Sequence, residues 1–187
     1  MPIIQKDNPT LRLMAKEVSI SEIGTAEIQK IIENMKEALH AEDDGVAIAA
    51  PQINVSLRIF VVSGKVPKLI ELQEKKETDL ELKDIKENIP DEIFINPKIV
   101  KTSKTRAVME EGCLSVRWLY GKVKRSKQVA IEAMNEKGEQ IKKGASGLMA
   151  QIFQHEIDHL DGVLFIDKAT DIEEYEPTPK NTESKIE

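Results

Sequence analysis

A chain of 187 residues is long enough to bury a core as one domain, and 40% apolar with 32% charged residues is the composition of a globular protein. The formal net charge of −6 and an aromatic content of 4% argue against a specific nucleic-acid partner, because proteins that bind nucleic acids carry basic surfaces and aromatic rings that stack on bases. No segment has the ~20 apolar residues of a membrane span, and the N-terminus lacks an apolar secretion signal, so we expect a cytoplasmic protein without a membrane partner.

The predicted elements begin with a helix and end with another. Apolar residues recur at helical spacing between Thr25 and Leu39, which predicts an amphipathic helix that stops before Gly45. A second strong helix is predicted from Gly147 to Leu160. Between them the chain is predicted to be largely sheet, with an apolar run at 46–50 and β-branched strands at 57–63, 92–95 and 129–134.

Two segments lack the apolar periodicity of the rest. Residues 64–91 are dense in Glu and Lys, and we interpret them as an exposed, charged excursion that is partly helical. Residues 171–187 are acidic and contain proline, so we expect a flexible tail after a domain that spans residues 1–170. A basic run is interpreted as the solvated edge of a strand and consists of Lys122, Lys124, Arg125 and Lys127.

The last predicted helix carries the pattern His-Glu-Ile-Asp-His at residues 155–159. Its two histidines project from one helix face, one turn apart, so both can reach one metal ion. Leu148 and Ile152 lie on the same side, which indicates that the imidazoles point inward, where they need a ligand or a hydrogen bond. The opposite, polar side is expected to carry Gln151, Gln154, Asp158 and Asp161. A chance occurrence on a surface helix is the competing interpretation.

A metal site needs a third protein ligand, and the residues leave two sources open. Metalloproteases with this helix usually find it downstream, where no candidate stands out by context among Asp161, Asp167, Asp171, Glu173 and Glu174. The single cysteine, Cys113, cannot form an internal disulfide and offers a thiol to a metal. Taken alone, it is equally explained as a small buried hydrophobic residue.

Three motifs in order resemble those of the peptide deformylases: Gly45–Gln52 (GVAIAAPQ), Glu111–Ser115 (EGCLS) and Gln154–Gly162 (QHEIDHLDG). The likeness extends over residues 3–168. It implies an α+β fold in which mixed, mostly antiparallel sheets surround a central metal-binding helix. It also implies an enzyme that removes the N-formyl group from the formyl-Met of nascent polypeptides and releases formate.

The resemblance also assigns roles within the site. Cys113, His155 and His159 would hold one divalent metal, and Glu156 would move the proton of the attacking water. Glu111 and, more weakly, Asp158 would support the histidines. The amide of Gln52 and the N–H of Leu114 would stabilise the developing oxyanion. The residues expected along the substrate are Gly45, Val46, Ala47, Ile48, Glu111 and Gly112.

Metal and partners follow from the same resemblance. Fe(II) is expected in the cell, with Zn, Ni or Co in purified protein, because Cys/His₂ ligation suits all of these metals. The partners would be formyl-Met nascent peptides and, transiently, the ribosome, although not through the acidic tail. Formyl-Met initiation places the protein in a bacterial cytoplasm or an organelle of bacterial ancestry. The residues do not predict an oligomeric state.

The chain departs from the family pattern at two places near the expected substrate. Ala47 stands where glycine is usual, and its methyl group either narrows the peptide groove or requires a backbone angle that glycine alone adopts easily. Arg117 and Trp118 stand where Pro-Gly is common, and Trp118 is expected either at the pocket or over the core. These departures keep two alternatives open: a deformylase-fold binding protein with weak or no activity, and a zinc protease with a downstream carboxylate ligand.

Overall fold

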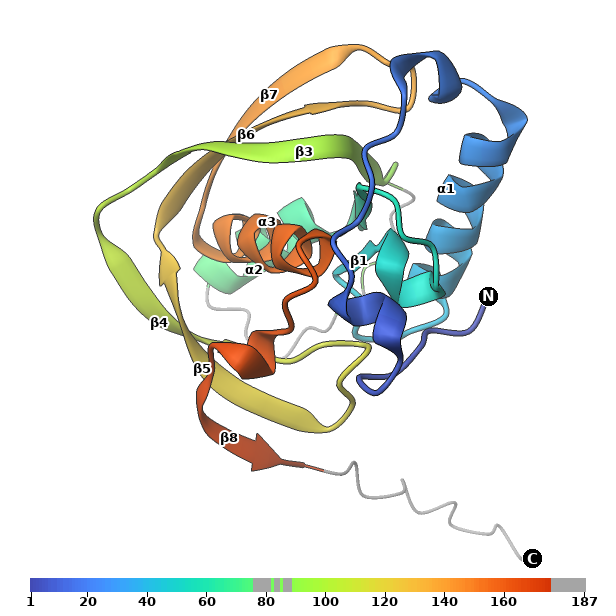
Figure 1. Cartoon of the computed structure of the whole chain (residues 1–187). Helices are drawn as coiled ribbons and strands as arrows, with labels where there is room; N and C mark the ends of the chain where they lie inside the picture. Colours follow the sequence, from blue (N-terminus) through green and yellow to red (C-terminus); the bar gives the residue numbers. More distant parts are fainter. Residues whose placement is uncertain (76–81, 83–84, 86–88, 176–187) are drawn as a thin grey trace, which may run out of the picture.

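Two antiparallel sheets wrap around helix α3 (Gly147–Leu160), and the other long helix, α1 (Ala26–His40), packs on the outside of the larger sheet (Figure 1). This computed structural model describes residues 1–75, 82, 85 and 89–175. All pairs of named strands are antiparallel, and one isolated parallel bridge joins Lys16 to Leu57. The expected α+β class, with mostly antiparallel sheets around a central helix, is confirmed.

The larger sheet has the strand order β1-β2-β3-β6-β7. Its strands are β1 (Ala47–Ala49), β2 (Ile59–Val62), β3 (Glu92–Thr102), β6 (Gln128–Met134) and β7 (Gln140–Ser146). The smaller sheet has the order β4-β5-β8 and consists of β4 (Arg106–Glu111), β5 (Leu119–Ser126) and β8 (Thr170–Glu174). Helix α3 contacts strands of both sheets, so both sheets hold it in place.

The helices begin and end where local chemistry favours it. The hydroxyl of Thr25 accepts a hydrogen bond from the backbone N–H of Ile28 and caps α1, whose apolar stripe is buried. Short 3₁₀ helices join the larger elements: η1 (Pro9–Arg12), η2 (Ile20–Glu22), η3 (Ala50–Ile53) and η5 (Phe165–Asp167). None of the described helices has the length and apolar character that a bilayer span requires.

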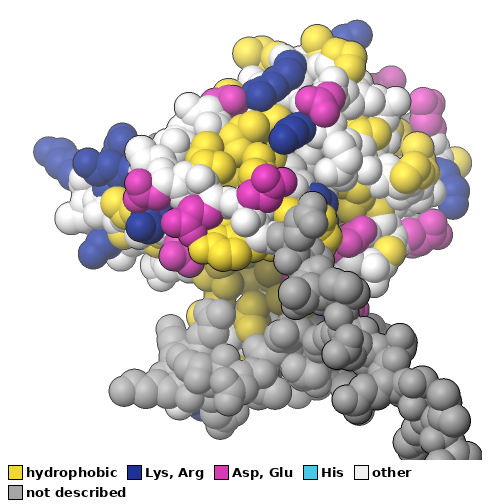
Figure 2. All heavy atoms as spheres, turned by 90° about the horizontal axis from the view of Figure 1, so that it is seen from below, with side chains coloured by type: hydrophobic (Ala, Val, Ile, Leu, Met, Phe, Trp, Pro, Cys, Tyr) yellow, Lys and Arg dark blue, Asp and Glu magenta, His cyan; other side chains and the backbone are white. Residues whose placement is uncertain are grey.

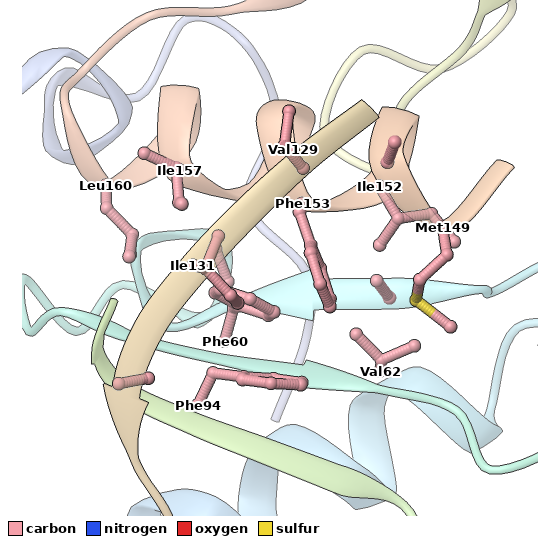
Figure 3. Close-up of a cluster of buried hydrophobic side chains, with 14 of the residues drawn as sticks. Phe60, Val62, Phe94, Val129, Ile131, Met149, Ile152, Phe153, Ile157 and Leu160 are labelled. Atoms are coloured by element: carbon pink, nitrogen blue, oxygen red, sulfur yellow. The ribbon is translucent and has the colours of Figure 1, made fainter. Parts of the chain in front are cut away.

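The core between α3 and the larger sheet is built around three aromatic rings. Phe60 and Phe94 stack with ring centroids 4.6 Å apart, and Phe153 of α3 meets Phe94 edge-on at 5.2 Å (Figure 3). All three side chains are fully buried, and such pairs add to the stabilisation that burial alone provides. This packing fixes the height and rotation of α3 over the sheet and thereby the direction of its histidines.

Both predicted helices are confirmed, and strands lie at each of the predicted positions. The strands β4, β7 and β8 were not predicted. These strands bury little surface: in β7 every second residue is half-buried and the others are exposed, and in β8 all residues are exposed. Such strands are held by ladder hydrogen bonds to neighbours that the local pattern does not reveal.

Two segment predictions need correction. The excursion at 64–91 is not simply exposed: it begins with α2 (Val66–Glu74), and a small cluster buries Leu69, Leu82 and Ile85 against Val46 and Leu148. Several of its other residues lie outside the described part of the chain. The tail does not begin at residue 171, because β8 pairs with β5 as far as Glu174. Residues 176–187 of the expected tail are likewise outside the described residues.

The surface carries both signs of charge. On the face shown in Figure 2, Lys and Arg side chains lie interspersed with Asp, Glu and hydrophobic side chains among the described residues. This face therefore has no extended field of one sign, in line with the weak case for a polyanionic partner.

Candidate metal centre

Helix α3 presents His155 and His159 on its inward face, with ring centroids 5.0 Å apart. Cys113 lies in the loop that follows β4, and its Sγ is 3.1 Å from His159 Nε2. One ligand atom from each of these three residues lies within 4.8 Å of the others. The structure thus brings together the three residues expected to hold a metal.

The surroundings of the two histidines suit metal binding in different ways. Glu111 Oε2 lies 3.0 Å from His155 Nδ1, which leaves Nε2 of that ring for a ligand. Burial lowers the pKa of His159 well below its usual value, so its imidazole is neutral at physiological pH. One thiol and two imidazole nitrogens form a donor set that divalent zinc and iron accept. The residues present therefore fit the metal that the family pattern implies.

Behind His155 lies a buried ionic network that the sequence only partly indicated. Arg125 binds both carboxylate oxygens of Glu111, at 2.7 and 2.8 Å, and also Asp158 at 2.6 Å. Burial would raise the pKa of Glu111, but hydrogen bonds from Arg125 and His155 lower it to about 2. Burial would lower the pKa of His155, but hydrogen bonds to Cys113 and Glu111 hold it well above its usual value. The ionised Glu111 therefore fixes the ring and increases its basicity.

This network corrects three residue predictions. Arg125 is not on a solvated edge, because it is only 4% exposed; Lys122, Lys124 and Lys127 are exposed as expected. Asp158 is not a solvated residue, since it bridges Arg125 and Lys168. Gln154 is not on a polar face either; it is buried, and its amide bonds both the N–H and the carbonyl of Ser126. A buried charge or amide gives no periodic signal, and only its partners explain it.

Glu156 stands apart from this network. The side chain is buried and lines the cavity beside the histidines, and among the described residues its Oε2 has no hydrogen-bond partner. Burial raises the pKa of Glu156 to about 7. A carboxyl group that is buried, unpaired and poised near neutral pH has the properties of a general acid–base.

Gln52 connects the first motif to the second. It lies in η3, where its Oε1 accepts a hydrogen bond of 2.8 Å from the backbone N–H of Ala49. Its amide nitrogen lies 3.2 Å from Ser115 Oγ and 3.6 Å from Cys113 Sγ. The amide donor therefore faces the candidate metal ligands in a fixed orientation.

A cavity of about 260 Å³ opens beside these groups. Of the residues expected along the substrate, Val46, Ala47, Glu111 and Gly112 line it, as do Gln52, Leu114, His155 and Glu156. Gly45 and Ile48 do not line it, and the side chain of Ile48 is fully buried in the core beside α1. Gln151 was expected on the opposite face of the helix, and that prediction is wrong: it lines the cavity with His155, and its amide donates to the carbonyl of Glu110. Tyr120, whose ring occupies the space beside Gly112, was not predicted as a cavity residue.

The two departures from the family pattern also lie at this cavity. Ala47 is in strand β1 and is not among the residues with positive φ, so its backbone accepts a methyl group without strain. Trp118 borders the cavity rather than covering the core, and its φ is +64°. Both departures therefore alter the shape of the cavity, and the cavity remains open beside the candidate metal ligands.

The carboxylates of the zinc protease alternative have other partners. Asp161 pairs with Arg58, Asp167 with Arg12 and Asp171 with Lys122. Glu173 binds the hydroxyl of Tyr175, and Glu174 lies in the exposed strand β8. Within the described residues, the group of potential ligands around the two histidines contains Cys113 and none of these carboxylates.

Comparison with known proteins agrees with this geometry. The family model for polypeptide deformylase matches residues 1–175. The peptide deformylase of Halothermothrix orenii is 40% identical over 93% of this chain and 98% of its own length, and the chloroplastic/mitochondrial peptide deformylase 1A of Arabidopsis thaliana is 37% identical over 89% of this chain and 60% of its own.

Solved structures show the same similarity. The actinonin complex of the Synechococcus elongatus enzyme is 32% identical with a TM-score of 0.72, covering 90% of this chain and 78% of that one. The Met-Ala-Ser complex of the class I type b enzyme from Acinetobacter baumannii is 28% identical with a TM-score of 0.73, covering 90% and 97%. A family match over nearly the whole chain, together with these relatives, shows that the chain belongs to the peptide deformylase family.

Proposed function

We propose that this protein is a metal-dependent hydrolase that removes the formyl group from the N-terminal formyl-Met of nascent polypeptides and releases formate. The observation that carries the proposal is a Cys113, His155 and His159 cluster that shares its cavity with the unpartnered carboxylate of Glu156. Membership of the family supports the same reaction.

We assign Cys113, His155 and His159 as the metal ligands. A divalent ion held there supplies Lewis acidity, which makes a water more acidic and polarises the formyl carbonyl. Ferrous iron is our assignment for the cell, and zinc, nickel or cobalt for purified protein, since a thiolate and two imidazoles accept each of them.

Glu156 is the proposed general base and acid. Its buried carboxylate accepts the proton of the attacking water and then delivers a proton to the amine that leaves as the C–N bond breaks. Burial raises the pKa of Glu156 to about 7 in the metal-free protein, and within the described part of the chain no partner competes for Oε2, which keeps that oxygen available.

The developing negative charge on the formyl oxygen needs donors that are already oriented. The Gln52 amide is held by Ala49, which fixes its donor side toward Cys113 and Ser115. The backbone N–H of Leu114 is the second proposed donor. Such preorganised donors contribute about 10² to 10³ in rate each.

The peptide is proposed to follow the wall formed by Val46 and Ala47 and the opposite wall at Glu111 and Gly112. Gly112 suits this role because a Cβ there would lie 2.8 Å from the Tyr120 ring, so only glycine leaves the backbone accessible beside it. The side chains of Val46 and Leu148 contribute apolar surface to the cavity, as the methionine side chain of the substrate requires.

The substrate also determines where the protein acts. Nascent chains with formyl-Met arise in the bacterial cytoplasm and in organelles of bacterial ancestry, and we propose one of these compartments with transient contact to the ribosome. The relatives include both bacterial and chloroplastic or mitochondrial enzymes.

One assay separates this function from its alternatives. The metal-loaded protein should release formate from formyl-Met-Ala-Ser and leave the internal peptide bonds intact. Cleavage of internal bonds would favour the protease alternative. Binding of the peptide without formate release would favour a binding protein, which the Ala47 substitution first suggested.

A further inference from the structure

The two walls of the cavity come from different sheets. Val46 and Ala47 belong to the segment of β1 in the larger sheet, whereas residues 113–118 join β4 to β5 in the smaller one (Figure 1). No ladder of the described strands joins the two sheets, so backbone pairing does not set the distance between the walls. Contacts outside the strand ladders must hold them together. One set runs through the N-terminal segment, where the Ile4 N–H donates to the Gln52 carbonyl and the Gln5 amide binds the carbonyl of Leu114 and the N–H of Arg117. Side chains of the walls themselves add direct links.

At the deep end, this link is Gln52. At the mouth, it is Arg117, whose guanidinium binds Asp44 through two bonds of 2.7 and 3.1 Å and Glu42 at 2.5 Å. The Arg117 side chain is 21% exposed, and a planar guanidinium that binds carboxylates on two residues is held more firmly than a single surface pair. Asp44 and Arg117 both line the cavity.

Trp118 extends this link over the mouth. The Arg117 guanidinium lies 5.3 Å from the centre of the indole ring, within cation–π range. The backbone of Trp118 is left-handed, with φ +64°, a conformation that a bulky residue adopts only when its surroundings hold it. The Trp118 carbonyl accepts a hydrogen bond of 2.8 Å from the N–H of Tyr175, so contacts hold both its backbone and its ring.

We propose that Arg117 is a positioning residue of the substrate groove: its ion pairs with Asp44 and Glu42 hold the wall that carries Trp118 against the wall that carries Val46 and Ala47. The inference rests on the proposed function for its substrate, a formyl-Met peptide. It assigns Arg117 to the width of the groove and not to the reacting atoms, since Arg117 binds the opposite wall.

The kinetic test uses Arg117→Ala with formyl-Met-Ala-Ser. A groove whose walls are no longer tied should bind the peptide less well, so KM is expected to rise about tenfold with kcat within about twofold. Arg117→Lys should restore part of the affinity. Asp44→Asn alone should reproduce part of the rise, because Glu42 still binds Arg117. The pair Glu42→Gln and Asp44→Asn together should reproduce the whole rise, and Arg117→Ala added to that pair should change KM little further, because the same contacts are already lost.

A matched control comes from β7, the strand at the opposite edge of the larger sheet from β1. Lys143 also forms an ion pair, with Glu92, and also lies over an aromatic ring, that of Phe94, but it does not line the cavity. Lys143→Ala should leave KM unchanged. An equal rise in KM for Lys143→Ala and Arg117→Ala would overturn the proposal. An unchanged KM in the variant that combines Glu42→Gln with Asp44→Asn, or a fall in kcat alone, would overturn it too.

A second readout does not depend on activity. Trp118 is the only tryptophan of the chain, so its fluorescence reports the mouth of the groove directly. Titration with the product peptide Met-Ala-Ser should change the emission of the wild type, and Arg117→Ala should shift the starting emission and weaken binding about tenfold. Wild-type emission and affinity in Arg117→Ala would overturn the proposal. A wild-type protein that binds this peptide but releases no formate would contradict the proposed function alone, and the titration would then decide the role of Arg117.

Discussion

The deep end and the mouth of the cavity are built in different ways. At the deep end, the chemical groups stand on helix α3 and short buried segments, and a network of Arg125, Glu111 and Asp158 holds them from behind. At the mouth, the walls are loops tied by the partly exposed Arg117. The reacting groups are therefore fixed by buried contacts, where the loss of one partner leaves a buried polar group unsatisfied and destabilises the fold. The substrate walls are fixed by partly exposed ion pairs, which contribute less to stability and which other residues can replace.

The largest effect on activity should come from replacing Cys113, the proposed metal ligand in the loop that follows β4 of the smaller sheet. Cys113→Ser replaces a thiolate by a neutral hydroxyl, so we expect loss of tightly held metal and of nearly all formate release. Metal analysis after dialysis measures the first effect. Asp161→Asn is the control, since that carboxylate pairs with Arg58, and its metal content should be unchanged. A full equivalent of metal in active Cys113→Ser protein would refute the ligand assignment.

Glu156→Gln should leave the metal in place and lower kcat about 10² to 10⁴-fold, because the amide keeps the shape of the side chain but cannot accept a proton. Metal content and formate release are measured on the same preparation. Wild-type turnover by the metal-loaded variant would show that another group moves the proton.

The buried network should show itself in the stability of the metal-free protein. The pKa of Glu111 is lowered to about 2 in the folded protein, below its ordinary value of 4.5, so its contribution is present above pH 4.5 and is lost as the pH falls toward 2. Glu111→Gln should therefore lower the free energy of unfolding by about 3 kcal/mol at pH 6.

At pH 3 the difference between the two proteins should be clearly smaller, since Glu111 is then protonated in the unfolded chain and folding must remove that proton. Denaturant titrations at the two pH values measure it. Equal differences at both would mean that the ionised form of Glu111 does not stabilise the fold.

The smallest effect is expected at the wall of the groove. Ala47→Gly removes a methyl group from the cavity lining without relieving backbone strain, since Ala47 does not have a positive φ. If the methyl group narrows the groove, KM for formyl-peptides should fall a few-fold with kcat little changed. An unchanged KM would show that the groove is already adapted to alanine.

The same contrast decides what could be predicted from the sequence. The two helices, the inward histidines and the motif around Cys113 were predictable, because helical periodicity and short motifs are local signals. The roles of Arg125, Gln154 and Arg117 were not, since a charge or an amide in a strand or loop looks solvated until its distant partner is known. Their partners lie 14, 28 and 73 or more residues away in the chain.

The origin of the three candidate ligands has one more consequence. Two stand on the helix that packs on the larger sheet, and the third stands on a loop of the smaller sheet, 46 residues from His159 in sequence. An ion bound by all three is therefore a cross-link between the two halves of the domain, and its binding energy adds to the cohesion of the whole chain. Removal of the metal by a chelator should consequently lower the melting temperature of the protein. It should also speed amide hydrogen exchange first in β4 and β5, the strands next to the loop that carries Cys113.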